Sequence, residues 1–167
     1  MVLDRPQQAT AARASIECFF AQKWPHKELI IFNSTGHRLV DSCPWRYREI
    51  ELRQRQPAQM LSLCFENSNG EWCLHWMPDC WYHSKYTEYH MAHRHKTHLT
   101  VLRNHRVFDL KNKRLVPSSD KTAVHWSFYR HFAVELESAV PLEKQFNVVD
   151  ELDNPSGLVV QFAREIL

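Results

Sequence analysis

Glycine is scarce in this chain, with only three residues among 167. Glycine allows a backbone to approach phosphate groups closely and to adopt left-handed turns. Neither the glycine-rich loop of P-loop proteins nor the GxGxxG fingerprint of dinucleotide-binding folds is present in the sequence. We therefore expect no phosphate site built on a glycine-rich loop.

Long apolar runs are also missing. The N-terminal segment contains no apolar core of signal-peptide length, and no stretch approaches the roughly 20 apolar residues needed to cross a bilayer. The five cysteines are odd in number and irregularly spaced, which is typical of reduced thiols rather than of a disulfide framework. The sequence thus predicts a cytoplasmic protein with no membrane partner.

Charge is nearly balanced overall, with a formal net charge of +2, but it is segregated along the chain. Residues 81–114 contain eight Lys or Arg against two acidic residues, whereas residues 135–167 contain two against seven. If each segment forms its own part of the surface, the protein has a basic face and an acidic face. The alternative is that the two segments lie together and neutralise each other.

Composition and length predict a single folded domain over residues 1–167, because 44% hydrophobic residues suffice for a core at this length. Helical signals are confined to the ends. Apolar residues recur at three- and four-residue spacing between Gln8 and Trp24. A second amphipathic helix is expected to start at Asn154-Pro155 and to run to Ile166.

Between the ends, alternating patterns predict antiparallel strands. Hairpins are expected for residues 29–32 with 37–40, for 60–66 with 71–77 around Asn69-Gly70, and for 105–109 with 114–117. One further strand is expected within 45–55, and 124–136 favours a long strand, although a helix would also gather its large apolar residues on one face. The expected fold class is α+β, mainly β: a strongly curved antiparallel sheet or a partly closed barrel with N- and C-terminal helices.

The central segment 81–108 is basic, aromatic and rich in histidine. Cations that contact phosphates and flat rings that stack on unpaired bases are what nucleic-acid binding requires. The leading hypothesis is therefore a non-enzymatic nucleic-acid-binding protein. The residues expected to contact the nucleic acid are Lys85, Tyr86, Tyr89, Arg94, Lys96, Arg103 and Arg106.

The same segment holds candidate metal ligands. His90, His93, His95 and His98 follow an H-x2-H-x-H-x2-H spacing, and imidazole is a good ligand for zinc. Neither this string nor the cysteines and histidines of residues 73–83 match a standard zinc-finger spacing. Zinc is the one cofactor that the sequence brings into consideration, and the alternative is a set of ordinary surface histidines.

Two arrangements could carry catalysis. In a hairpin around Asn69-Gly70, Cys64, Cys73 and His75 would share the face away from the core, where the imidazole could activate a thiol. Separately, the triplets 98–100 (HLT) and 125–127 (HWS) are similar to the paired H-x-[ST] motifs of the 2H phosphoesterases. That resemblance implies two histidines as general acid and base and two hydroxyls that hold the phosphate. A metal- or histidine-dependent phosphoesterase is thus one alternative function.

Two non-catalytic functions also fit the sequence. A partly closed barrel could hold a small apolar or planar ligand in a cavity lined by Trp72, Trp76, Trp126 and Phe128. The acidic C-terminal region could instead dock a protein partner, in which case the chain is an adaptor.

Overall fold

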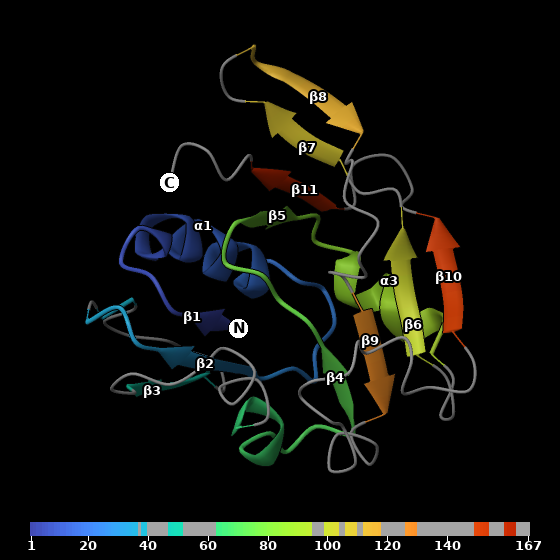
Figure 1. Cartoon of the computed structure of the whole chain (residues 1–167). Coiled ribbons are helices and arrows are strands. Elements are labelled where there is room, and N and C mark those ends of the chain that lie inside the picture. Colours follow the sequence, from blue (N-terminus) through green and yellow to red (C-terminus); the bar gives the residue numbers. More distant parts are fainter. Residues whose placement is uncertain are drawn as a thin grey trace.

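The computed structural model describes residues 1–36, 38–39, 47–51, 63–94, 99–103, 106–109, 112–117, 126–129, 149–153 and 159–162. Within these ranges the strands form three open sheets, of three, four and four strands (Figure 1). Two of the helices, α1 (Gln8–Phe20) and α3 (Tyr86–Ala92), lie between strands along the chain, and α1 contacts strands of the first and third sheets.

The first sheet is entirely parallel and contains β1 (Val2–Leu3), β2 (Leu29–Asn33) and β3 (Tyr47–Glu51) in that order. Helix α1 (Gln8–Phe20) connects β1 to β2, which makes a strand–helix–strand unit. All five residues of β2 are buried, as expected for a parallel strand that is covered on both faces. The sheet therefore has a defined carboxyl edge, where β1 and β2 end, and an amino edge, where they begin.

Helix α1 forms because its apolar residues lie three or four positions apart. Ala9, Ala12, Ile16 and Phe19 are buried on one side, and the chain reaches Pro25 soon after the helix ends. This side packs against β1 and against β5 (Cys80–Tyr82). The N-terminal helix predicted from Gln8 is confirmed, and it ends four residues before the predicted Trp24.

Two mixed sheets complete the fold. The second has the order β10-β6-β9-β4 and the third β5-β11-β7-β8. Their remaining elements are β4 (Trp72–Leu74), α3 (Tyr86–Ala92), β6 (Leu99–Arg103), β7 (Arg106–Asp109), β8 (Arg114–Pro117), β9 (Trp126–Tyr129), β10 (Val149–Asp153) and β11 (Val159–Phe162). Figure 1 shows the β7–β8 hairpin at the end of the molecule farthest from β3.

An aromatic cluster forms the centre of the core. The rings of Trp76 and Tyr82 are stacked with centroids 3.9 Å apart, and Tyr86 meets Trp76 edge-on at 5.5 Å. Phe19 of α1 contacts the same indole edge-on at 5.7 Å. Leu3, Leu29 and Ile31 of the first sheet belong to the same core cluster, so these rings join the first sheet to β5 of the third.

The expected curved antiparallel sheet or partly closed barrel is wrong. The described strands make three separate open sheets, and parallel pairs occur in each of them. The error came from reading consecutive strands as hairpins. A helix between two strands returns the chain to the same edge of the sheet, so the strands become parallel neighbours.

Two expected hairpins are also wrong. Strand β2 is paired on both sides, with β1 and β3, so residues 37–40 cannot pair with it. Residues 63–66 form a helical turn instead of a strand, and β4 pairs with β9 instead of with them. The third hairpin is confirmed as β7–β8, with Lys113 in the left-handed region at φ 51° in its turn.

The C-terminal helix is wrong as well. Residues 159–162 form β11, which lies between β5 and β7. Of the long strand expected over 124–136, residues 126–129 are the strand β9, and the other residues lie outside the described ranges. None of the helices in the described part of the chain has the length and apolar character of a membrane span.

Candidate functional site

The carboxyl edge of the first sheet carries a group of polar residues. Asp4 and Arg5 follow β1 directly, and Asn33 ends β2 and is followed by Ser34 and Thr35. In open sheets with parallel strands, ligands bind in the crevice outside the carboxyl ends of the strands. The carboxyl edge of the first sheet is therefore the candidate binding site.

The turn from β1 into α1 combines a cation with a helix start that has no side-chain cap. The N–H groups of Gln8 and Ala9 donate to the carbonyls of Arg5 and Pro6. The backbone N–H groups of Asp4 and Arg5 donate to Gln8 Oε1 at 3.0 and 3.1 Å. Gln7 at the N-cap makes no side-chain capping bond, and the first turn of α1 contains no acidic residue. The Arg5 side chain is 61% exposed, and its Nε lies 3.5 Å from Asp4 Oδ1. A guanidinium beside the positive end of a helix favours a bound anion such as a diphosphate.

The end of β2 is held in a fixed turn against β1. Asn33 is buried, and its Oδ1 accepts hydrogen bonds from the Thr35 N–H at 3.0 Å and the Thr35 hydroxyl at 2.6 Å. Ser34 donates to the Leu3 carbonyl twice, from its N–H and from its hydroxyl, both at 3.0 Å. These bonds join the two strand ends, so polar groups from β1 and β2 are presented at one place.

The segment between β4 and β5, residues 75–79, is bound to the middle of α1. Ser15 Oγ donates to the Met77 carbonyl at 2.8 Å, and Trp76 Nε1 donates to the Ser15 carbonyl at 3.1 Å. Figure 1 shows this segment passing along α1 before it enters β5. It ends at Asp79, a buried carboxylate whose Oδ1 lies 3.9 Å from Cys80 Sγ.

The two tyrosines predicted to stack on bases do not form an exposed platform. Tyr86 is fully buried in the aromatic core, where burial raises its pKa well above the usual value. Tyr89 is half-buried, and its ring contacts His93 with centroids 4.5 Å apart. A base could not reach the Tyr86 ring without opening the core.

The predicted phosphate contacts are divided between two elements. Lys85 precedes α3 and Arg94 follows it, and both are exposed, whereas the exposed Arg106 begins β7 in the third sheet. Lys96 and the side chain of Arg103 lie outside the described residues. A single surface formed by all seven predicted residues is therefore not seen in the part of the chain that can be described.

The predicted zinc ligands are also separated. His90 is fully buried on α3 and its Nδ1 lies 2.9 Å from Ser127 Oγ, whereas His93 is exposed and its Nδ1 lies 2.8 Å from the Tyr89 carbonyl. Among the described residues, no three His, Cys, Asp or Glu side chains are close enough to share a metal ion. His95 and His98 are not described, so the four-histidine site stays a prediction.

The hydroxyl-bearing residues of the two H-x-[ST] triplets are neighbours in the second sheet, where both are buried. Thr100 on β6 and Ser127 on β9 are paired in register, and both are fully buried. The partner of Ser127 is His90, and the histidines of the triplets themselves, at positions 98 and 125, lie outside the described residues. A phosphate in solution could not reach these hydroxyls, because both residues are fully buried.

The proposed cysteine–histidine face exists in a different form. Cys64, Cys73 and His75 do not pair across a hairpin, but all three line one cavity at the amino edge of the first sheet. Cys64 is buried, and burial raises the pKa of its thiol, which disfavours the nucleophilic thiolate. Cys64 therefore lacks the activation that a catalytic thiol needs.

Sequence reasoning missed the residues at the carboxyl edge. The signal was present in the order of elements: an apolar Val2-Leu3 followed by a polar turn, a helix, and the fully apolar run 29–32. A buried strand on each side of a helix indicates a parallel pair. That reading would have placed Asp4, Arg5 and Asn33 at the edge where ligands bind.

The arrangement of strands and helices resembles that of TarS from S. aureus, one structure of which contains the sugar nucleotide UDP-GlcNAc. S. aureus TarS, residues 1–349, in complex with UDP-GlcNAc matches with a TM-score of 0.70 and 11% sequence identity, over 98% of this chain and 58% of that one. The same part of TarS described without a ligand matches with a TM-score of 0.67, also at 11% identity, over 96% of this chain and 59% of that one. No family model and no curated protein matches the sequence.

The leading hypothesis of a non-enzymatic nucleic-acid-binding protein is contradicted, because the fold resembles that of TarS, which was solved with UDP-GlcNAc, and the predicted stacking residue Tyr86 is buried in the core. The ligand-holding barrel is contradicted, because the described strands form three open sheets. Trp76, one of the residues expected to line the barrel, lies between β4 and β5 and is buried in the core. The chain spans less than three fifths of the length of the TarS chains that it matches. At 11% identity the likeness is one of fold, and the chain takes the arrangement seen in a UDP-GlcNAc complex.

Proposed function

We propose that this chain is the nucleotide-sugar-binding part of a glycosyltransferase, with a UDP-sugar as the donor. The observation that carries the proposal is the likeness over 98% of the chain to TarS in complex with UDP-GlcNAc. The polar carboxyl edge of the parallel sheet supports it independently, because nucleotides bind at that edge in related architectures.

The diphosphate is the group that this edge suits best. In glycosyl transfer the bond between the sugar carbon and the phosphate oxygen breaks, UDP leaves with the electron pair, and an acceptor hydroxyl oxygen bonds to the sugar and loses its proton. The leaving UDP gains negative charge as that bond breaks. Arg5 and the positive end of the α1 dipole would stabilise this charge.

The ends of β1 and β2 would hold the nucleoside. Asp4 carries a carboxylate that accepts hydrogen bonds from ribose hydroxyls or from the uracil N–H. The turn at Asn33, Ser34 and Thr35 is fixed by four hydrogen bonds, so it would act as a rigid wall. We assign no general base for the acceptor among the described residues.

Calorimetric titration with UDP-GlcNAc and with UDP tests the proposal directly, with AMP as the control nucleotide. We expect UDP and UDP-GlcNAc to bind, AMP to bind more weakly, and Arg5→Met to weaken UDP binding about tenfold through loss of a charge-assisted contact. Arg106→Met, which removes an exposed arginine from β7, is the matched control and should leave the affinity unchanged.

Two outcomes would overturn the proposal. The first is the absence of binding at millimolar UDP-GlcNAc by protein that unfolds cooperatively. The second is a wild-type affinity in Arg5→Met together with a reduced affinity in Arg106→Met, which would move the site to another sheet.

A cytoplasmic location is part of the same proposal. The described cysteines Cys18, Cys64, Cys73 and Cys80 are thiols. Buried thiols persist in a reducing compartment. Labelling of thiols in freshly lysed cells, before and after reduction, would test this, and a thiol count that rises on reduction would contradict it.

A further inference from the structure

A cavity of about 1060 Å³ opens at the amino edge of the first sheet, away from the strand ends that carry Asp4 and Asn33. It is bounded by the chain after α1, by the first residues of β2, by β4 and by the C-terminal end of α3. Because β2 and β4 belong to different open sheets, the cavity is not the interior of a barrel. Its volume is close to the upper end of the range typical of small-molecule sites, and the proposed nucleotide site does not use it.

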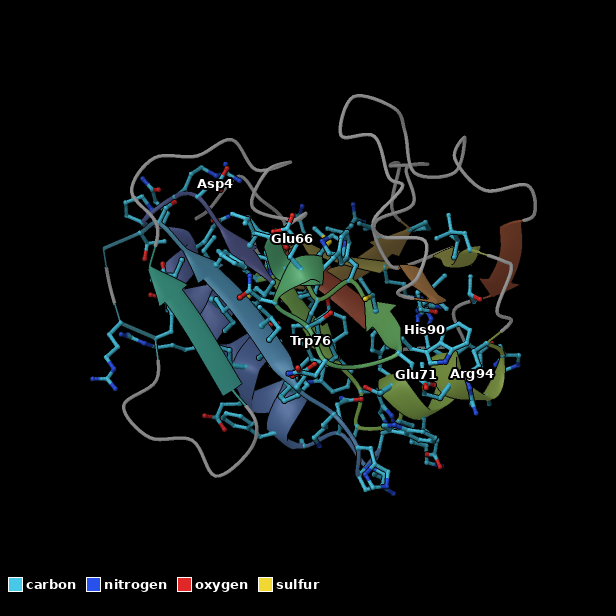
Figure 2. All side chains as sticks on the ribbon, turned by 90° about the horizontal axis from the view of Figure 1, so that it is seen from below. Asp4, Glu66, Glu71, Trp76, His90 and Arg94 are labelled. Carbon is cyan, nitrogen blue, oxygen red and sulfur yellow. The ribbon has the colours of Figure 1, made fainter. Side chains whose placement is uncertain are left out.

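Aromatic rings and a thioether contribute to the wall. The Phe and Trp residues among the described lining residues are Phe19, Trp24, Phe65, Trp72 and Trp76. Met91 is buried on the α3 side. Trp76 connects the cavity to the aromatic core, and Figure 2 shows it between the first sheet and Arg94, which follows α3. Flat rings with a flexible thioether favour contact with a flat apolar molecule.

The hydroxyl groups in the wall are hydrogen-bonded within the protein. Ser68 Oγ donates to the Phe65 carbonyl at 2.8 Å, and Thr87 Oγ1 donates to Gln22 Oε1 at 3.1 Å. A polar ligand would have to compete with these bonds, and such an exchange gains little because one hydrogen bond replaces another. The hydroxyls therefore give a polar ligand no advantage over an apolar one.

The charged residues of the wall are balanced in sign. The Lys27 ammonium donates to two backbone carbonyls at and just after the end of α1, and the Glu28 carboxylate accepts from the loop 69–70. Both side chains make further interactions within the fold. With Arg94 and Glu71, the described lining residues include two cations and two carboxylates, so their formal charges cancel when the histidines are neutral. An ion of either sign would lose its hydration there without an opposite excess charge to compensate it.

We infer that this cavity binds a neutral, flat, apolar molecule: a linked or fused aromatic ring system without a charged group. Its rings contact Phe65, Trp72 and Met91, and burial of apolar surface supplies most of the binding free energy. The cavity is separate from the carboxyl edge, so the inference goes beyond the proposed function and does not depend on it.

Two fluorescent probes with the same ring skeleton distinguish a neutral from a charged ligand. Phenylnaphthylamine is neutral, and anilinonaphthalene sulfonate adds a sulfonate to the same rings. We expect phenylnaphthylamine to bind saturably, with one molecule per chain and energy transfer from tryptophan. The sulfonate should bind about tenfold more weakly, because its charge must be desolvated.

One pair of variants tests the place of binding. Ala92 is exposed at the end of α3 and lines the cavity, so Ala92→Trp should fill the opening and abolish binding of phenylnaphthylamine. Glu88→Trp, which is exposed on the same helix and outside the cavity, should bind the probe normally. Near-UV circular dichroism of each variant establishes that the probe reports a folded protein, because loosely packed states also bind such dyes.

A second pair tests the contribution of a ring. Phe65→Leu keeps an apolar side chain and removes the ring, so it should weaken binding of phenylnaphthylamine about fivefold. Phe20→Leu is the matched control, because Phe20 is a half-buried phenylalanine at the end of α1 that is not among the lining residues. Its affinity for the probe should equal that of the wild type.

Folded wild type that does not bind phenylnaphthylamine, or binding that is unchanged in both Ala92→Trp and Phe65→Leu, would overturn the inference. Equal affinity for the sulfonate would overturn the choice of a neutral ligand. Displacement of phenylnaphthylamine by UDP-GlcNAc would overturn the separation of the two sites. A failure to bind UDP-GlcNAc, with normal probe binding, would count against the proposed function alone.

Discussion

The buried histidine of α3 makes the stability of this protein depend on pH in a way that one substitution should remove. His90 is fully buried, and burial, with a smaller effect of the neighbouring His93, lowers its pKa from 6.5 to about 3. Its Nδ1 lies 2.9 Å from Ser127 Oγ, and no described residue is a hydrogen-bond partner of its Nε2. The folded protein therefore holds a neutral imidazole.

The sign of the effect follows from comparing the two states. The unfolded chain binds a proton on this histidine near pH 6.5, whereas the folded chain stays neutral down to about pH 3. The free energy of unfolding therefore falls as the pH drops below 6.5. The loss is about 1.4 kcal/mol for each pH unit, or about 2 kcal/mol between pH 7 and pH 5.

Urea unfolding followed by tryptophan fluorescence at pH 7, 6 and 5 measures this loss. His90→Gln retains a group that can bond to Ser127 but does not titrate, so the difference between wild type and variant should change by about 2 kcal/mol over this range. The exposed His93→Gln on the same helix is the control. If wild type and His90→Gln lose stability in parallel as the pH falls, the reasoning about a buried neutral histidine is refuted.

Three further outcomes are expected. Glu28→Ala removes the acceptor of the loop 69–70 and should lower the free energy of unfolding by about 1 kcal/mol in urea titrations, with Glu66→Ala as an exposed control. Gly36→Ala meets no atom within 4 Å of the added Cβ, so its cost should be the backbone strain at φ +74° alone, about 1 to 2 kcal/mol in thermal unfolding. Burial raises the pKa of the Cys18 and Cys64 thiols, so alkylation by iodoacetamide at pH 7.5 should be slower than in the urea-unfolded protein, as mass spectrometry would show. Equal rates in the two states would contradict the burial of these thiols.

Local patterns in the sequence predicted the elements that depend on local forces. The helix from Gln8 and the β7–β8 hairpin follow from side-chain spacing and from a tight turn, and both are confirmed. The partners of β2 do not follow from such signals, since a parallel neighbour is set by where the intervening helix returns the chain. The segment 159–162 has an amphipathic helical pattern, yet it is a strand because β5 and β7 lie on either side of it.

The candidate site was harder to predict than the fold. Cations and aromatic rings are concentrated in residues 81–108, which predicts a binding surface there, whereas Tyr86 and His90 form part of the core. The carboxyl edge uses a few ordinary polar residues, and they are significant only because the strands β1 and β2 run in the same direction. The relative direction of two strands depends on how the whole chain assembles, so it cannot be predicted from any short segment of the sequence.

Two hydrogen bonds at Ser15 hold helix α1 and the segment that leads to Asp79 together. One residue of α1 both donates to the chain after β4 and accepts from it, at Met77 and Trp76, so a slide of the helix by a single position would break both bonds at once. Each bond contributes about 1 kcal/mol, so together they favour joint movement of the helix and the segment over sliding of one past the other. A ligand bound at the start of α1 would therefore meet a helix that is already held in place along its middle.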